Sequence, residues 1–330
     1  MAGKDRSNEI RISRVYDAPV KMVWDAWTDP TQVALWWGPR GFTLTTHSKD
    51  LRPGGHWTYT MHGPDGTDYE NTTFYHEVEP YARLVYDHGA NDDRPPLFRV
   101  TATFAEEEGQ TRLELRFTLA SPEVAEQTRQ FIKKAGGDAT WDRLAEHLAE
   151  ESTGRRPFFI NRSFATPIDT MFQMWTDPAH LSAWLAPTGF TMTYLRADIR
   201  PGASSLWKMT NGQGITMYAH AEYREIAGPH RIVYVQNFCD ENEALCRHPL
   251  ASTWPAYMLT RVTLTEEGPD RTRVTIESAT HGEATPLELE TFVAGRTGMT
   301  SGWTGAFDKL EEVLTAVDVN GVLRGGLLVR

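Results

Sequence analysis

The chain has 330 residues, of which 40 % are hydrophobic and 11 % aromatic, and its formal net charge is −11. That length suits two domains of ordinary size, and the composition is that of a globular protein rather than a disordered one. An acidic chain offers no basic surface for a phosphate backbone, which excludes nucleic acids and anionic membranes as expected partners.

The N-terminal residues and the cysteines indicate the compartment. The first residues, MAGKDRSNEIRISR, are charged and lack the apolar segment of a signal peptide. Nowhere does an uncharged apolar run approach the length of a membrane span. Two cysteines, Cys239 and Cys246, are too few for a disulfide framework across the chain and suit a reducing compartment. We expect a soluble cytoplasmic protein.

The two halves of the chain repeat each other, with tryptophan, glycine and proline residues in the same order. The Trp-Thr-Asp-Pro motif at residues 27–30 recurs at 175–178, and the Arg-Pro-Gly motif at 52–54 recurs at 200–202. The repeat predicts two domains, residues 1–152 and 153–330, with an inserted loop near 237–256 in the second copy.

Each copy opens with an extended run, residues 10–16 or 158–164. A proline follows, Pro19 or Pro167, which suits the first turn of a helix because that position needs no backbone N–H. Apolar residues then recur with helical spacing up to the Trp-Thr-Asp-Pro motif, whose proline opens a second helix. Each copy is therefore predicted to begin with one strand and two short helices.

The middle of each copy consists of short runs separated by glycine and proline, such as LRPGG, GPDG and EEG in the first copy. Such punctuation is typical of an antiparallel meander. Residues 122–150 and 286–316 carry the spacing of a long amphipathic helix. The predicted fold class is α+β, with each long C-terminal helix lying on its sheet.

Strand alternation identifies the side chains that face the interior of each predicted sheet. Those faces are rich in tryptophan, tyrosine and methionine, which line small-molecule pockets and ordinary cores alike. His88, Arg99, His220 and Arg261 are further candidates for the mouth of a cavity. Asn71 is the least expected polar group inside the first copy. The candidate ligand-binding residues are Trp37, Trp57, Tyr59, Met61, Tyr69, Asn71, Tyr75, His88, Trp207, Met209, Met217, Tyr223 and Arg261.

The segments RVYDAPVKMVWDAWTDPTQVALWWGPRGF in the first copy and RSFATPIDTMFQMWTDPAHLSAW in the second carry a family resemblance. Both copies resemble the SRPBCC superfamily, and most closely its activator of Hsp90 ATPase homologue 1-like branch. The resemblance implies a helix-grip (Bet v 1-like) architecture in each copy. In that architecture a curved seven-stranded antiparallel sheet surrounds a long C-terminal helix, with two short helices and an apolar cavity. It implies no particular reaction or ligand.

Sequence motifs for catalysis and metal binding do not occur in the chain. Cys239, Cys246 and His248 share a loop, but their C-x6-C-x-H spacing does not match the short spacings of structural zinc sites. The chain has no HExxH, no GxSxG and no P-loop. We expect no metal and no other cofactor. No catalytic residue is assigned, and whether the protein is an enzyme stays open.

The expected function is the binding of a hydrophobic small molecule in a helix-grip cavity. One alternative is a cyclase or isomerase acting on a polyketide-like or other apolar metabolite, and another is a self-protection protein that sequesters a reactive metabolite. A third is a co-regulator of an Hsp90-type chaperone ATPase, which rests on the branch name alone, since no residue identifies a protein partner. Because inward residues diverge, as at Trp57 and Ser205, we do not expect the two cavities to share one function.

Overall fold

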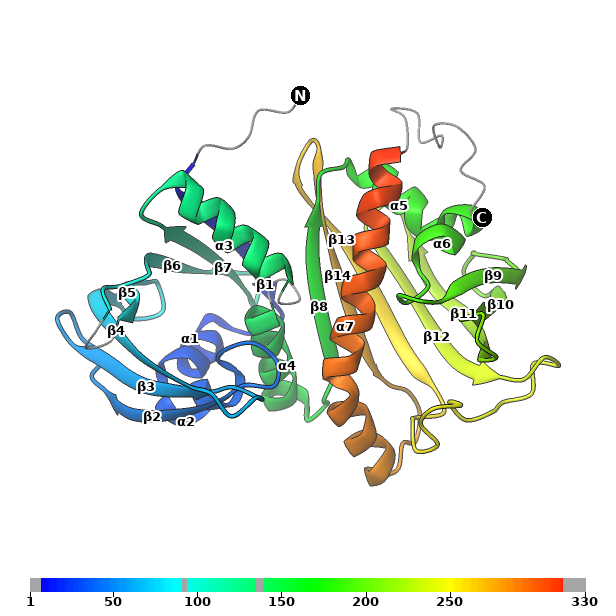
Figure 1. Cartoon of the computed structure of the whole chain (residues 1–330), viewed down its shortest axis with the longest axis horizontal. Coiled ribbons are helices and arrows are strands. Elements are labelled where there is room, and N and C mark those ends of the chain that lie inside the picture. The colour runs from blue at the N-terminus through cyan, green and yellow to red at the C-terminus, as the bar shows by residue number, and fades with distance from the viewer. Residues whose placement is uncertain (1–6, 91–93, 135–138, 317–330) are drawn as a thin grey trace. The chain divides into compact units, whose positions relative to one another are not determined.

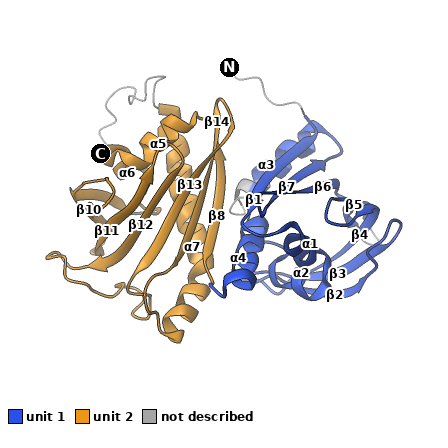
Figure 2. Cartoon of the chain, turned by 180° about the vertical axis from the view of Figure 1, so that it is seen from behind, with its two compact units in different colours: residues 1–155 blue, residues 156–330 orange. Residues whose placement is uncertain are grey.

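The two halves of the chain fold into the same succession of strands and short helices. The computed structural model describes residues 7–90, 94–134 and 139–316, in two units formed by residues 1–155 (unit 1) and 156–330 (unit 2) (Figure 2). Each unit has one seven-stranded antiparallel sheet, in the order β1-β7-β6-β5-β4-β3-β2 or β8-β14-β13-β12-β11-β10-β9 (Figure 1). The predicted α+β class with two seven-stranded antiparallel sheets is confirmed.

In the C-terminal region of unit 1 a single helix is expected over residues 122–150. The region is described as two helices, α3 and α4, and residues 135–138 lie outside the described residues. The elements of unit 1 are β1 (Glu9–Tyr16), α1 (Val20–Thr28), α2 (Pro30–Trp36), β2 (Thr43–Lys49), β3 (His56–His62), β4 (Asp68–Glu79), β5 (Arg83–Ala90), β6 (Phe98–Glu107), β7 (Gln110–Thr118), α3 (Pro122–Lys134) and α4 (Ala139–Thr153).

The last described element of unit 2 is one long helix, as predicted, and Figure 1 shows this helix, α7, lying along its sheet. Among the described residues, no helix combines the length and the apolar character needed to span a membrane. The elements of unit 2 are β8 (Phe158–Phe164), α5 (Ile168–Thr176), α6 (Pro178–Trp184), β9 (Thr191–Arg196), β10 (Ser204–Thr210), β11 (Thr216–Ala227), β12 (Arg231–Cys239), β13 (Met258–Gly268), β14 (Arg271–Thr280) and α7 (Pro286–Ala316).

The Trp-Thr-Asp-Pro motif forms the corner between the two short helices of each unit. In unit 1 the Asp29 carboxylate accepts hydrogen bonds from the backbone N–H groups of Thr31 and Gln32, at 2.7 and 3.0 Å. Such a cap, with proline at the first helical position, satisfies donors that the helix itself leaves open. Asp177 caps α6 in the same way. The repeated motif is therefore a helix-start signal that works in both units.

The C-terminal helices cover the inner faces of the sheets. Trp141 and Leu144 of α4 belong to the core of unit 1, and Phe292 and Phe307 of α7 belong to the core of unit 2. On the strands below, buried residues alternate with more exposed ones, as in β7 and β13. This alternation places one face of each sheet against its helix and the other face outward.

A cation from each C-terminal helix holds the turn that follows the second short helix. In unit 1 the Arg143 guanidinium donates to backbone carbonyls, and its burial lowers its pKa to about 10. In unit 2 the Lys309 ammonium donates to the carbonyls of Ala186 and Pro187, at 2.8 and 3.1 Å. The carbonyl acceptors of Arg143 are those of Leu35, Trp37, Gly38, Pro39 and Phe42.

Replacing Arg143 by leucine should lower the free energy of opening around α2 and α4 by about 2–4 kcal/mol, because several carbonyls lose a charged donor. Native-state hydrogen exchange followed by mass spectrometry measures this for peptides from those helices. Arg112→Leu is the control, since the ion pair of Arg112 with Glu107 is largely exposed and contributes little. Equal effects of the two substitutions would show that the Arg143 contacts do not hold this corner.

Candidate functional site

Aromatic rings fill the deep part of the inner face of unit 1. Trp57 and Tyr59, on β3, are each 1 % exposed, and their rings stack at a centroid distance of 4.0 Å. Trp37, which follows α2, packs edge-on against Trp57 at 5.4 Å. Side chains with so little exposure border almost no space of the size of a water molecule. This part of the predicted cavity is therefore core.

The other predicted residues of unit 1 lie at different depths. Tyr75 and Asn71 are buried on β4, whereas Met61 is partly buried and Tyr69 is 43 % exposed near the start of β4. The Asn71 amide donates to the backbone carbonyl of Tyr69 at 2.9 Å. The least expected polar group of this interior therefore has a hydrogen-bond partner within its own strand.

His88 lies at the end of β5 among aromatic rings. Its ring stacks on Phe98 at 4.9 Å, and its Nδ1 atom is 3.4 Å from the hydroxyl of Tyr59. Burial, with a smaller contribution from the charge of Arg94, lowers the pKa of His88 to about 4. The imidazole is therefore neutral at pH 7. In that state it can donate one hydrogen bond and accept another, but it carries no positive charge.

Lys49 is a charged group that the sequence analysis did not identify. Its Nζ atom lies 4.1 Å from the centroid of the Trp57 ring and donates to the backbone carbonyl of Trp27 at 2.9 Å. Burial lowers the pKa of Lys49 to about 7, against a smaller opposing effect of Asp29. The signal available in the sequence was a lysine three residues before the Arg-Pro-Gly motif, and a lysine is ordinarily a solvated residue.

The predicted residues of unit 2 gather on the inner face of its sheet. Trp207 and Tyr223 are buried there, and Met209 and Met217 are partly buried on the paired strands β10 and β11. Trp207 is 5 % exposed and its ring lies 5.9 Å from that of Tyr194. Its Nε1 atom is buried and has no hydrogen-bond partner within the described part of the chain.

The inner faces of the two units carry different side chains at equivalent positions. In unit 1 the indole N–H of Trp57 donates to the hydroxyl of Thr46 on the neighbouring strand at 3.1 Å. The equivalent residues of unit 2 are Ser205 and Tyr194, so the large side chain lies on the neighbouring strand there. Several other positions become smaller. Trp37, Asn71, Thr73, Val100 and Phe117 are replaced by Leu185, Ala219, Ala221, Thr260 and Ser278.

Hydroxyl groups accordingly run across the inner face of unit 2. The hydroxyl of Tyr223 faces those of Ser205 and Tyr194. Further along, the hydroxyl groups of Thr260 and Ser278 are 3.2 Å apart. Burial raises the pKa of the Tyr194 and Tyr223 phenols, so they stay protonated at neutral pH. The hydroxyl groups of this face can therefore donate and accept hydrogen bonds, but none of them acts as a base at neutral pH.

Arg261 is not brought together with the other predicted residues. It precedes the buried Val262 on β13, so its side chain points to the outer face, where it forms an ion pair with Glu277. The alternation of side chains along a strand requires this placement. The structure therefore does not place Arg261 near Met217 or Tyr223 on the inner face.

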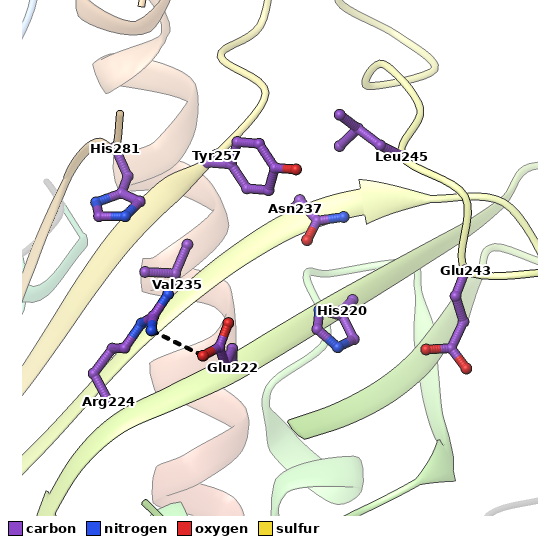
Figure 3. A pocket seen from close by; sticks show the side chains of 9 residues that line it. All are labelled: His220, Glu222, Arg224, Val235, Asn237, Glu243, Leu245, Tyr257 and His281. Atoms are coloured by element: carbon purple, nitrogen blue, oxygen red, sulfur yellow. Dashed lines mark ion pairs between the residues drawn. The ribbon is translucent and has the colours of Figure 1, made fainter. Parts of the chain in front are cut away.

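A pocket of about 620 Å³ opens on the outer face of the sheet of unit 2 (Figure 3). Its floor comes from β11 and β12 and one wall from the inserted loop that follows β12. The sequence analysis expected His220 only as a candidate for a cavity mouth, and the remaining lining residues were missed. The residues that line the pocket are His220, Glu222, Arg224, Val235, Asn237, Glu243, Leu245, Tyr257 and His281.

Ion pairs balance the charges of this outer pocket. Arg224 pairs with Glu222 at 2.8 Å, and Glu243 accepts two hydrogen bonds from Arg196 at 2.6 and 2.8 Å. Within the described ranges, no group of three His, Cys, Asp or Glu side chains is placed to hold a metal ion. The polar character of the pocket therefore comes from compensated ion pairs and from imidazole, phenol and amide side chains.

The low pKa of His88 makes the stability of unit 1 depend on pH. Histidine in an unfolded chain titrates near 6.5, so the unfolded state binds more protons than the folded state between pH 6.5 and about 4. Stability is complete above this window and should fall by up to about 3 kcal/mol as the pH drops through it. His88→Gln introduces the residue type found at the equivalent Gln236 and should flatten this loss in urea unfolding experiments at a series of pH values. Parallel pH profiles for both proteins would contradict the assignment.

Comparisons with known proteins identify the family to which the chain belongs. The family model described as Activator of Hsp90 ATPase homolog 1-like protein matches residues 17–149 and 165–315. Protein Ms6760 from Mycobacterium smegmatis is similar in structure, with 23 % identity, coverage of 49 % of this chain and 92 % of that chain, and a TM-score of 0.41. A protein from Arthrobacter aurescens has 27 % identity, coverage of 44 % and 88 %, and a TM-score of 0.40.

One similar structure spans both units. The di-domain ARO/CYC BexL from the BE-7585A biosynthetic pathway has 13 % identity, covers 92 % of this chain and 97 % of that chain, and has a TM-score of 0.38. No curated protein matches the chain. Because the family model matches more than half of the chain, in two successive regions, the chain belongs to the Activator of Hsp90 ATPase homolog 1-like family, as a tandem pair.

Proposed function

We propose that the inner face of unit 2 binds a small apolar molecule that carries a hydrogen-bond acceptor. The observation that carries this proposal is the indole N–H of Trp207, which is buried and lacks a partner among the described residues. A buried donor without a partner costs about 1–3 kcal/mol. A carbonyl or ether oxygen of a bound molecule would remove that cost.

Neighbouring residues favour the opening of space beside Trp207, whose side chain is 5 % exposed. Trp207 pairs across the sheet with Ala219, and Ala221 follows two residues later on the same face, so small side chains stand next to the ring. In unit 1 the corresponding positions hold Asn71 and Thr73. The partly buried Met209 and Met217 add adaptable apolar surface of the kind that lines ligand pockets.

One side of α7 supports an entrance to this face. A Cβ atom added to Gly298 or Gly302 would meet no other atom within 4 Å. At Gly295 and Gly305, on either side, the added atom would approach Trp254 at 2.8 Å and Thr188 at 2.3 Å. The middle of this glycine row therefore borders open space between the inserted loop and the turn that precedes β9.

Binding is favoured over acid–base catalysis by the kind of polar groups present. The phenols of Tyr194, Tyr223 and Tyr234 have pKa values raised by burial, so they act as hydrogen-bond donors and acceptors rather than as bases. Positioned neutral hydroxyls give orientation to a ligand without moving its protons. The cyclase, self-protection and chaperone alternatives gain no specific support from these residues.

Two isosteric probes test the proposal. We expect 2-acetylnaphthalene, which has a carbonyl acceptor, to bind about tenfold more tightly than 2-isopropylnaphthalene, because only the ketone satisfies the Trp207 N–H. Trp207→Phe should remove this difference while the binding of the hydrocarbon persists. Equilibrium dialysis with chromatographic measurement of the free probe gives both affinities.

Lys208→Met is the matched control for this experiment, because Lys208 neighbours Trp207 on β10 but points to the other face. It should keep the preference for the ketone, and circular dichroism checks that each variant folds. If neither probe binds, the inner face is not a ligand site. If both probes bind equally to the unmodified protein, the site exists but Trp207 does not select for an acceptor.

A further inference from the structure

The outer pocket of unit 2 is separated from the inner face by the sheet itself. His220, Glu222 and Arg224 alternate along β11 with Ala219, Ala221 and Tyr223, which belong to the core. Figure 3 shows the lining side chains on the side of the strands that faces away from α7. A molecule in this pocket would therefore contact different residues from one bound beside Trp207.

The inserted loop that walls the pocket is held in place at several points. Its start returns antiparallel to β12, with a backbone bridge between Cys239 and Leu245. Further along, Arg247 forms an ion pair with Glu288 of α7, and the hydroxyl of Thr291 donates to that of Thr253 at 2.9 Å. Contacts at both ends give the loop one defined course, so the pocket wall is a built feature of the fold.

Unit 1 has no equivalent of this pocket lining on the same strand. The positions of His220 and Glu222 correspond to Thr72 and Phe74, and Phe74 is 43 % exposed. The inserted loop itself is present only in the second copy. The pocket therefore depends on two changes specific to unit 2, the polar residues on β11 and the loop above them.

The charges in the pocket do not favour a charged ligand. Each carboxylate already has a guanidinium partner, Glu222 with Arg224 and Glu243 with Arg196. An anion would compete with these carboxylates for the arginines, and a cation would compete with the arginines for the carboxylates. A neutral ligand avoids both costs, since it leaves the pairs intact and uses their remaining hydrogen-bonding capacity.

The other polar side chains of the pocket offer donors and acceptors together. His220 and His281 carry imidazoles, Tyr257 a phenol, and the amide of Asn237 donates to the carbonyl of Phe238, which leaves its oxygen as an acceptor. Val235 and Leu245 add apolar contact. Alternating donors and acceptors around a ring with C–H faces are the chemistry of a sugar. We infer that this pocket is a second binding site, for a neutral polyhydroxylated molecule of sugar size.

Saturation-transfer NMR on the full chain tests this inference with methyl glucoside, methyl galactoside and N-acetylglucosamine as probes. At least one should bind with a dissociation constant on the order of 1 mM, as expected for a polar pocket open to water. His220→Ala and Asn237→Ala should each weaken that binding about tenfold, because they remove hydrogen bonds without breaking either ion pair. Both positions lie on the outward side of their strands, and circular dichroism verifies folding.

Thr72→Ala, at the position equivalent to His220 on β4 of unit 1, is the matched control and should leave sugar binding unchanged. Spermidine and inorganic phosphate serve as the charged probes, and neither should displace the sugar at equal concentration. The inference is overturned if no sugar shows saturation transfer, if the two pocket variants bind as the unmodified protein does, or if either charged probe displaces the sugar.

Discussion

The structure of each unit depends on one constraint, namely that the C-terminal helix must cover the inner face of the sheet. A single antiparallel sheet leaves one apolar face to solvent unless another element packs on it. α4 and α7 supply that cover through Trp141, Leu144, Phe292 and Phe307. The same helices carry the cations that bind the carbonyls after α2 and α6, so one helix both closes the core and fixes the neighbouring turn.

Once this frame is in place, the residues of the inner faces can diverge in a correlated way. In unit 1 Trp57 lies under the ammonium of Lys49, and in unit 2 both positions become small, Ser205 and Ala197. The large ring reappears on the adjacent strand as Tyr194. Close packing requires such compensation, because a core tolerates changes that preserve volume better than changes that do not. The result is an aromatic interior in unit 1 and a hydroxyl-bearing interior in unit 2.

Part of the candidate site could be predicted from sequence. Alternation placed Trp57, Tyr59 and Trp207 on inner faces, because the period of a strand is local. The same rule puts Arg261 outward, since it precedes Val262, and the sequence analysis was wrong to group it with inward residues. The sequence did not predict that Tyr69, near the start of β4, is 43 % exposed. The exposure of a residue at either end of a strand depends on which distant segments pack on it, and the neighbouring residues in the sequence do not indicate this.

The sequence by itself determined the repeat, the helix starts, the meander and the family, because each rests on local patterns of proline, glycine and apolar residues. Only the tertiary structure decided which polar atoms are buried and which partners they meet. The carbonyls bound by Arg143, the low pKa values of Lys49 and His88 and the unpartnered N–H of Trp207 arise from contacts between segments distant in the chain. Desolvation depends on three-dimensional packing, which no periodicity encodes.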